Sequence, residues 1–188
     1  MSFSVVTSHP LLDAIFARTS VRHYTGQPPS QEQLRILVQA GMAAPSAVDR
    51  RPWEFIVVTR MDLLEQLRDR LPHCKMITQA GAAVVVVGDR MRQYRGFDLD
   101  YWIMDCSAAV QNILLAATAL GFGSVWTAAY PDPQRVKVVR EILHIPHEHL
   151  VPLAVIPIGT PVGDETPKDK WDSSHMHWET FGNNVIDK

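Results

Sequence analysis

Cysteine is scarce in this chain, with only Cys74 and Cys106 among 188 residues. The two do not form a pair with metal-binding spacing. Cys106 lies in an apolar stretch, where a free cysteine commonly packs as a small hydrophobic side chain. We therefore expect both thiols to serve core packing.

An excess of charge of either sign is also lacking. Eighteen Lys and Arg residues nearly balance 20 Asp and Glu residues, so the formal net charge is only -2. No run of Lys or Arg occurs, and the chain therefore has no electrostatic footprint for nucleic acid or an anionic membrane surface. We expect neither as a partner.

Targeting and membrane signals are missing as well. The first ten residues, MSFSVVTSHP, have neither the basic nor the long apolar region of a secretory signal, which predicts cytoplasmic residence. The segment 101–120 is about as long as a bilayer-spanning helix, but Asp105, Gln111 and Asn112 interrupt it. We predict a helix buried in protein, with some of its neighbours coming from a second subunit.

The length and the 46% hydrophobic content predict a single domain, residues 1–188, with a substantial core. Apolar spacing and capping signals predict helices that alternate imperfectly with strands, and hence a layered α/β or α+β fold with helices on both faces of a sheet. The expected helices are one capped by Ser8 and ending near Arg18, one opened by a capping box of Ser30 and Gln33 and ending between Gly41 and Pro45, and those over 63–70, 101–120 and 133–143. The expected strands cover 54–59, 82–88 and 151–158, with a turn into a further strand within 121–130.

Composition changes at Gly159, after which Pro, Asp, Lys and aromatic residues dominate. Such a segment is too polar to build its own core, yet too rich in Trp and Phe to remain solvated. We interpret it as an arm that packs on another surface.

Arg18, Ser20 and Arg22 occupy every second position of RTSVRHY. In an extended segment these side chains project the same way, and two guanidinium groups with a hydroxyl suit a phosphate. The same spacing is common on solvated surfaces, so this segment alone leaves both interpretations open.

Three further segments suit a ligand, although each also has a purely structural explanation. The loop 45–53 can approach a flat ligand closely, or serve as a rigid connector with Trp53 as a core anchor. The segment 121–130 can offer backbone to a planar ring, or form a glycine turn before a core strand. The segment 167–170 places two ammonium groups near an anion, or lies on a solvated loop.

In this order and at these separations, the four segments resemble the FMN-dependent nitroreductase family. RTSVRHY is similar to its flavin phosphate signature, APSAVDRRPWEFIVV to its APSAxNxQPWxF loop, and DCSAAVQNILLAATALGFGSVW to its long dimer-core helix. PKDK resembles its PKxK or PKxR segment, and the match runs over nearly the whole chain. The resemblance implies an α+β fold of three α-β-α layers, a mixed and mostly antiparallel sheet, and a C-terminal arm, residues 160–188, that embraces a dimer partner.

The resemblance also implies bound FMN, with NADH or NADPH as electron donor, in a homodimer whose active sites lie at the subunit interface. One subunit would hold the phosphate, ribityl chain and pyrimidine edge, and would offer backbone near the flavin N5. The residues assigned to these contacts are Arg18, Thr19, Ser20, Arg22, Thr127, Ala128, Ala129, Lys168 and Lys170. The other subunit would contact the ring through Pro45, Ser46, Ala47 and Asp49.

Two residues depart from the family pattern: Asp49 stands where Asn is usual, and Arg51 where Gln is usual. An ionised Asp accepts hydrogen bonds but cannot donate them, so it cannot make any contact in which the family's Asn donates. Asp49 could pair with Arg51 or Arg50 and preserve the loop, or it could tune the substrate site.

The implied reaction is ping-pong: a nicotinamide delivers hydride to FMN, and a nitroaromatic, a quinone or a similar electron-poor molecule then takes the electrons. Arg22 would stabilise the reduced flavin, and no catalytic side chain is needed. The alternatives are a flavin-destroying or dehalogenating enzyme of the same fold and a non-catalytic flavin-binding or sensing module. A metal site at His144, His147 and His149 is disfavoured because Pro146 interrupts any ligand-bearing helix there.

Overall fold

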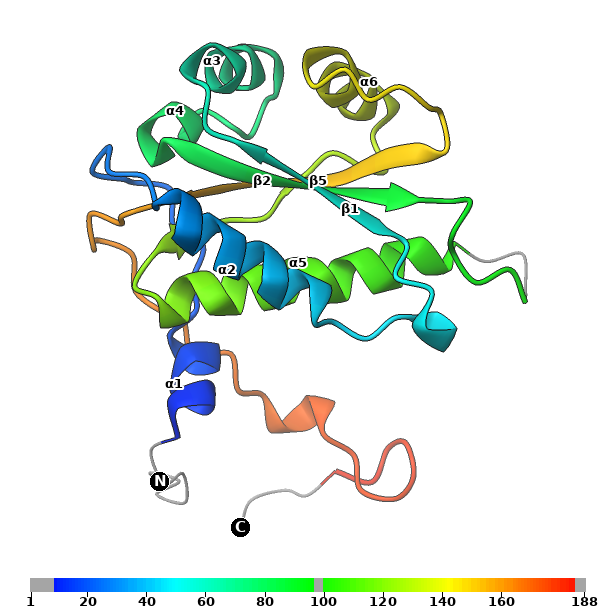
Figure 1. Cartoon of the computed structure of the whole chain (residues 1–188). Helices are drawn as coiled ribbons and strands as arrows, with labels where there is room; N and C mark the ends of the chain where they lie inside the picture. The colour runs from blue at the N-terminus through cyan, green and yellow to red at the C-terminus, as the bar shows by residue number, and fades with distance from the viewer. Residues whose placement is uncertain (1–8, 97–99, 185–188) are drawn as a thin grey trace.

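The computed structural model describes residues 9–96 and 100–184, and places a five-stranded sheet between two layers of helices (Figure 1). The strand order is β1-β2-β5-β3, and β4 also pairs with β5. Every pairing between these strands is antiparallel, with one parallel bridge between Ser20 and Ser124 at the edge. The strands are β1 (Trp53–Val58), β2 (Ala82–Asp89), β3 (Gly123–Ser124), β4 (Thr127–Ala128) and β5 (Leu150–Gly159). The expected three-layer α+β class is confirmed.

The centre of the sheet is apolar on both faces, because β2 is buried along its whole length. Alternate side chains of a strand point to opposite faces. Val84 and Val86 accordingly pack in the core beneath α2 and α5, whereas Val85 and Val87 pack beneath α3 and α6. This double burial explains the unbroken β-branched run in the sequence.

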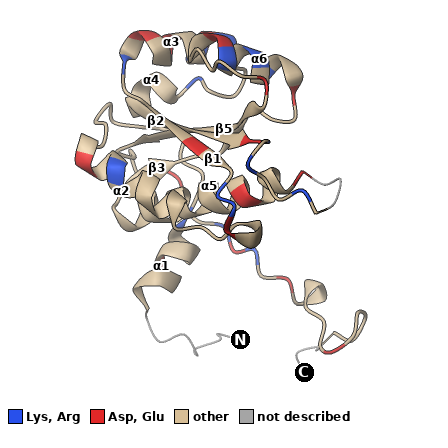
Figure 2. Cartoon of the chain, turned by 45° about the vertical axis from the view of Figure 1, so that its right-hand side comes forward, with Lys and Arg blue, Asp and Glu red and all other residues tan. Residues whose placement is uncertain are grey.

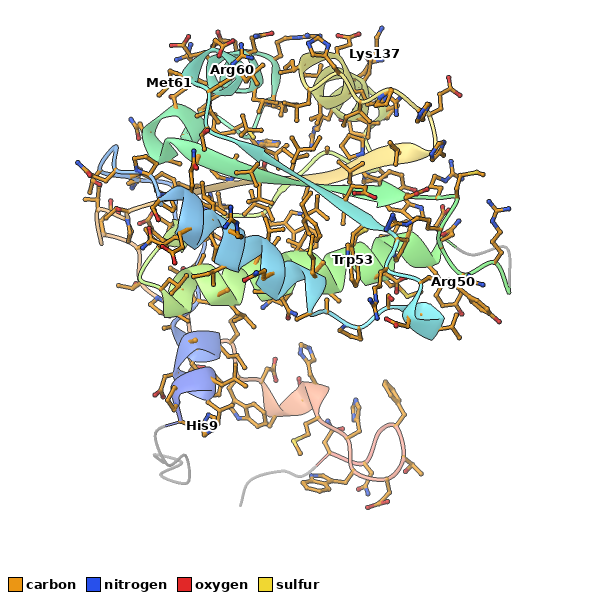
Figure 3. The ribbon with its side chains drawn as sticks, in the orientation of Figure 1. His9, Arg50, Trp53, Arg60, Met61 and Lys137 are labelled. Carbon is orange, nitrogen blue, oxygen red and sulfur yellow. The ribbon has the colours of Figure 1, made fainter. Side chains whose placement is uncertain are left out.

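One face of the sheet is covered by α3 (Met61–Arg70), the short α4 (Ile77–Ala80) and α6 (Pro133–Ile142). Asp132 caps α6 by accepting hydrogen bonds from two backbone N–H groups of its first turn. Charged residues are frequent along α3 and α6 (Figure 2). Arg60, Met61 and Lys137 lie on this outer side in Figure 3.

The other face is covered by α2 (Gln31–Met42) and α5 (Tyr101–Ala119), and α1 (Pro10–Ala17) packs against α5 on the side away from the sheet. The predicted capping box of Ser30 and Gln33 is present at the start of α2. The cap expected for α1 was wrong: the side chain of His9 accepts the capping hydrogen bond from the N–H of Leu11. Ser8 itself lies outside the described residues. Pro10 fixes the first helical position, which places the cap one residue later than expected.

Helix α5 is not buried on all sides within one chain. Met104 is 55% exposed, and it begins a stripe with the spacing of one helix face. The stripe continues through the exposed or half-exposed residues Ala108, Gln111, Leu115 and Thr118. None of the described helices is long and apolar enough to cross a bilayer.

The strand predicted within 121–130 is present as two short pieces, β3 and β4, in one register with β5. A turn through Gly121, whose φ is 80°, connects α5 to them. The segment was predicted as one strand because its apolar pattern does not reveal where pairing with β5 is interrupted.

The arm begins as part of the sheet edge and then leaves the body of the molecule (Figure 1). Tyr24 bridges Pro161, and the N–H of Val162 donates to the carbonyl of His23. Farther along, Trp171 and Phe181 are 64% and 93% exposed. The described part of the arm therefore presents large apolar side chains that its own chain does not cover.

Candidate functional site

A cavity of about 400 Å³ lies beside β4 and brings together segments that are far apart in the sequence. Arg22, Thr127 and Ala128, all expected at a cofactor site, contribute to its wall. The remaining lining residues are Pro72, His73, Lys75, Met76, Val125, Trp126 and Arg135. A cavity of this size matches the volume of small-molecule and cofactor sites.

The backbone around Arg22 is fixed from two sides. The N–H of Val21 donates to the carbonyl of Ser124 at 3.0 Å, which ties this extended segment to β3. A Cβ at Gly123 would lie 2.6 Å from the side chain of Val21, so glycine is needed for this approach. On the other side, Oε1 of Glu165 accepts hydrogen bonds from the N–H groups of Arg22 and His23.

Neighbouring residues of the extended segment 18–22 line different cavities. Thr19 and Val21 line a second cavity of about 200 Å³, near the C-terminal end of α5, whereas Arg22 lines the larger one. Thr19 therefore faces away from Arg22. Arg18 and Ser20 are half-buried, and neither belongs to the wall of the larger cavity.

The three small residues at the end of the 121–130 segment differ in what they expose. The side chain of Thr127 faces the core, where its Oγ1 donates to the carbonyl of Val155 at 2.6 Å. Ala128 is exposed at the cavity. Ala129 is buried, its N–H donates to the carbonyl of Leu153, and it does not line the cavity.

The sequence did not predict two cationic side chains of the cavity wall. Lys75 follows α3 and donates from Nζ to the carbonyl of Arg68 at 3.0 Å. Arg135 lies in the first turn of α6, with Nε 3.1 Å from Oδ2 of Asp132. Neither belongs to a spaced motif, and only the fold brings them beside Arg22. The buried Cys74 holds the Lys75 segment against β4, because its Sγ lies 3.1 Å from the hydroxyl of Thr127.

The loop 45–53 lies beside the N-terminal half of α5, whereas Thr19, Val21 and Gly123 lie near its C-terminal end (Figure 1). The N–H of Ala47 donates to Oδ1 of Asp105, a buried side chain in the first half of α5. Burial raises the pKa of the Asp105 carboxyl, and this backbone hydrogen bond opposes the rise. Ser46 accepts a hydrogen bond from the N–H of Arg51, so the loop is also closed on itself.

One chain does not bring its two groups of expected site residues together. Thr118, near the Arg22 end, and Asp105, which holds the loop, are separated by about 20 Å along α5 at 1.5 Å per residue. Pro45, Ser46, Ala47 and Asp49 accordingly do not line the cavity to which Arg22 contributes.

Comparison with known proteins agrees with this architecture. The Nitroreductase family profile matches residues 15–73 and 68–160. The chain belongs to the nitroreductase family. A protein of Methanothermobacter thermautotrophicus, whose assignment as an NADH dehydrogenase/NAD(P)H nitroreductase is itself provisional, is 40% identical over 94% of this chain and 90% of its own length.

Solved nitroreductase structures share the fold. A crystal structure from Bacteroides thetaiotaomicron, with the same provisional assignment, has a TM-score of 0.86 and 46% identity over 93% of this chain and all of its own. An FMN-dependent nitroreductase from Clostridium difficile has a TM-score of 0.79 and 27% identity over 90% of this chain and 99% of its own. The family and fold expected from the sequence are thereby confirmed.

Lys168 and Lys170 of the arm follow shortly after Glu165, the residue that binds the backbone of Arg22. Lys168 follows Glu165 by three residues, which allows a separation of at most about 10 Å in extended chain. Both Lys168 and Lys170 are exposed. Their contact with a phosphate stays a prediction.

His144, His147 and His149 do not form a group of close metal-ligand atoms among the described residues. His147 and His149 stack with ring centroids 5.2 Å apart, but no group of three close ligand atoms among the described residues includes them. Among the described residues, the one group of three close ligand atoms comes from His23, Asp164 and Glu165. Glu165 already accepts from two backbone N–H groups, so we interpret this cluster as the anchor of the arm.

Proposed function

We propose that this nitroreductase family member is an FMN-dependent oxidoreductase that uses NADH or NADPH to reduce nitroaromatics, quinones or similar electron-poor molecules by a ping-pong mechanism. The observation that carries the proposal is the cavity in which Arg22 lies beside the backbone of β4. A solved relative from Desulfovibrio desulfuricans, 28% identical with a TM-score of 0.77, is described as a complex with FMN.

The residues present fit a flavin mononucleotide. Arg22, Lys75 and Arg135 give the cavity three cationic side chains, which suits a ligand that carries a phosphate. Exposed Ala128 adds no bulky side chain to the wall, so a planar ring can approach the backbone there. Bound FMN would supply the hydride transfer, which no side chain of this chain needs to perform.

Each part of the protein then has a binding task. Arg18, Ser20 and Arg22, assisted by Lys168 and Lys170, hold the phosphate and the pyrimidine edge. The 127–129 backbone supports the ring near N5, with Thr127 and Ala128 closest to the cavity. The positive charge of Arg22 would favour a bound ring that carries negative charge.

A second copy of the chain completes the site. The loop residues Pro45, Ser46, Ala47 and Asp49 lie about 20 Å along α5 from the Arg22 end, so they serve the partner's cofactor. Two α5 helices packed antiparallel place the loop end of one beside the Arg22 end of the other. The active sites accordingly lie at the interface of a homodimer.

The exposed apolar surface supports this assembly. The stripe on α5 that begins at Met104 carries no Lys, Arg or Glu, and Figure 2 shows few charges on α1 and α5. On α1, Leu11 and Phe16 are 58% and 64% exposed. Contiguous apolar surface of this kind marks an interaction site. Residues 160–188, of which the structure describes 160–184, are assigned as the arm that embraces the partner, and the chain functions as one domain.

The state of the cysteines agrees with a cytoplasmic enzyme. The two cysteines are free and buried, as expected for core thiols. Such a chain needs no oxidising environment, which agrees with a cytoplasmic enzyme that draws on the nicotinamide pool.

The test is an absorbance spectrum of the purified, untagged protein, followed by anaerobic addition of NADPH and then NADH. We expect flavin bands that bleach with at least one donor and return when a nitroaromatic or a quinone is added. Flavin bands that resist both donors would favour a binding or sensing module. Failure to bind added FMN would overturn the proposal.

A further inference from the structure

The loop 45–53 is held in a conformation that its own residues do not favour. Val48, Asp49 and Arg51 have φ values of 45°, 55° and 49°, in the left-handed region. A β-branched residue such as Val48 is seldom found there. Such backbone persists only where the surroundings hold it, and it concentrates at binding and catalytic sites.

Groups from outside the loop hold it near both ends, and the carbonyl of Pro52 accepts from Cys106 Sγ and from the N–H of Asp89. Asp105 of α5 accepts from the N–H of Ala47 at 2.9 Å, near the beginning. Near the other end, Arg92 donates from Nη2 to the carbonyl of Arg51 at 2.8 Å. Arg92 follows β2 in the chain and is separated from the loop by about forty residues.

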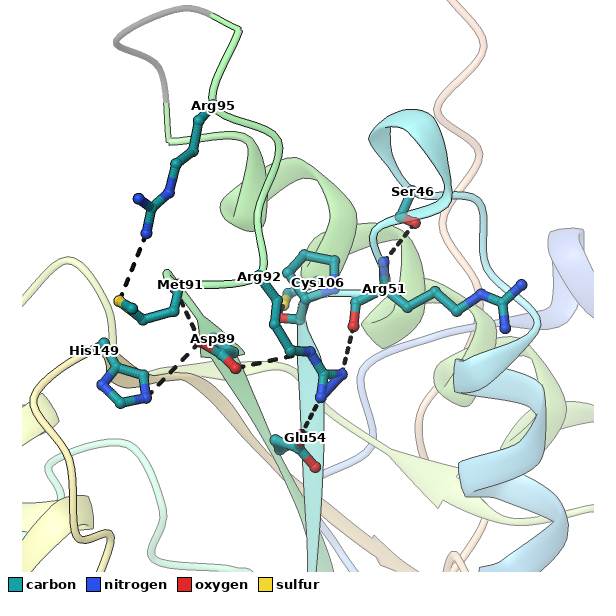
Figure 4. A network of polar contacts seen from close by, with 10 residues as sticks. Ser46, Arg51, Glu54, Asp89, Met91, Arg92, Arg95, Cys106 and His149 are labelled. Atoms are coloured by element: carbon teal, nitrogen blue, oxygen red, sulfur yellow. Dashed lines mark hydrogen bonds and ion pairs between the residues drawn. The ribbon is translucent and has the colours of Figure 1, made fainter.

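Arg92 binds three groups in different directions (Figure 4). Besides binding the carbonyl of Arg51, Arg92 donates from Nη1 to Oε1 of Glu54 at 2.8 Å. The Nε of Arg92 lies 3.7 Å from Oδ2 of Asp89. Asp89 is itself fixed, because Oδ1 accepts from the N–H of Met91. A guanidinium can serve three such acceptors at once, whereas an ammonium on a flexible stem cannot match this fork.

We propose that Arg92 is a positioning residue, which fastens the strained 45–53 loop to the ends of β1 and β2 and so prepares it for the partner's cofactor. This inference rests on the proposed function for the identity of the ligand. The fastening itself rests on the contacts of Arg92 with Arg51, Glu54 and Asp89.

Asp105 is a poor residue with which to test the idea, since it is buried in α5 and its replacement affects folding. Arg92 is better, because its side chain is 47% exposed. Arg92→Met removes all the donors and keeps much of the stem. Arg92→Lys keeps the charge but not the fork. Arg95→Met is the matched control, because Arg95 lies in the same segment and its side chain makes no hydrogen bond to the described part of the loop; it donates to the sulfur of Met91, at 3.5 Å.

The first measurement is tryptic cleavage between Arg50 and Arg51 of the purified, FMN-saturated protein under native conditions, followed by mass spectrometry. Cleavage of a transiently opened loop tracks the population of the open form. We expect cleavage about three- to tenfold faster in Arg92→Met, less acceleration in Arg92→Lys, and the wild-type rate in Arg95→Met. A wild-type rate in Arg92→Met would overturn the proposal.

The second measurement separates positioning from general stability. With the midpoint of urea unfolding as a check on the fold, we expect the FMN dissociation constant to rise in Arg92→Met and partly recover in Arg92→Lys. At saturating FMN, kcat should return toward the wild-type value. Faster cleavage with an unchanged dissociation constant would overturn the link to the cofactor. If the wild-type protein bound no flavin, the proposed function would fail, whereas cleavage rates of the same variants without flavin would still decide the fastening.

Discussion

Asp49 and Arg51 form a two-point ion pair, with Nε to Oδ1 at 2.7 Å and Nη2 to Oδ2 at 2.5 Å. The hydrogen bond from Arg51 lowers the pKa of the Asp49 carboxyl below its ordinary value, so the pair persists at neutral pH. The two residues that depart from the family pattern therefore satisfy each other. Of the two possibilities that the sequence left open, the structure contains the pairing, and it involves Arg51 rather than Arg50.

Asp49→Asn should change substrate preference rather than stability. The substitution releases the guanidinium of Arg51 and adds positive charge to the loop, while the exposed pair itself contributes little to stability. We expect the KM for 4-nitrobenzoate to fall about two- to fivefold relative to that for 4-nitrobenzamide, an effect weakened by salt. Steady-state kinetics with both substrates measures it. The control is the double variant Asp49→Asn/Arg51→Gln, and equal changes for both substrates would contradict the charge argument.

Arg22→Met should weaken FMN binding by about 1.5 to 3 kcal/mol, or roughly ten- to a hundredfold, because it removes a charge-assisted contact at the cavity. Fluorescence titration of the flavin-free protein with FMN measures the dissociation constant. Arg60→Met is the matched control, since Arg60 lies on the outer surface and pairs with Asp62. Equal losses in both variants, or none in Arg22→Met, would remove Arg22 from the site.

Local signals in the sequence predicted much of this fold. The capping box of Ser30 and Gln33 fixes where α2 begins, and the β-branched run of β2 is what a strand buried on both faces requires. The cap of α1 was misplaced because a histidine ring accepted the bond that a hydroxyl was expected to accept. Such short-range competition depends on the side-chain conformation, which the sequence does not specify.

The site was less predictable than the fold. Arg22 stands in a regular motif, whereas Lys75 and Arg135 reach the cavity only through the packing of α3 and α6. Arg92 carries no signal either, because its importance depends on a loop about forty residues earlier in the chain. Contacts between segments far apart in the chain depend on the tertiary structure. Neither the amino-acid composition nor the spacing of residues in the sequence predicts them.

Burial of Cys106 should make stability fall at alkaline pH. Burial raises the pKa of this thiol to about 12, whereas a thiol in the unfolded chain ionises near pH 8.5. Above that pH the unfolded state has lost a proton that the folded state keeps, so stability decreases as pH rises. We expect Cys106 to reduce the free energy of unfolding by about 1 kcal/mol between pH 7.5 and 9.5. Urea unfolding at both pH values measures this, and a slope unchanged in Cys106→Ala would contradict it.

Glu165 is the acceptor for two successive backbone N–H groups, those of Arg22 at 2.5 Å and His23 at 3.1 Å. Its side chain is only 18% exposed, so water cannot readily replace it. The carboxylate thus joins the base of the arm to the segment that presents Arg22. Asp164, the preceding residue, is 52% exposed and pairs with the imidazole of His23 instead.

Glu165→Ala should therefore reduce stability by about 1 to 3 kcal/mol, because it leaves two N–H groups without their acceptor. It should also weaken FMN binding severalfold, since the backbone that carries Arg22 loses its support. Glu165→Gln keeps an acceptor oxygen and should recover part of both losses, whereas Asp164→Asn, an exposed change beside it, should alter neither by much. Urea unfolding and FMN titration of the three variants measure these effects. If Asp164→Asn matched Glu165→Ala, the effect would come from the charge of the arm, and not from the hydrogen bonds of Glu165.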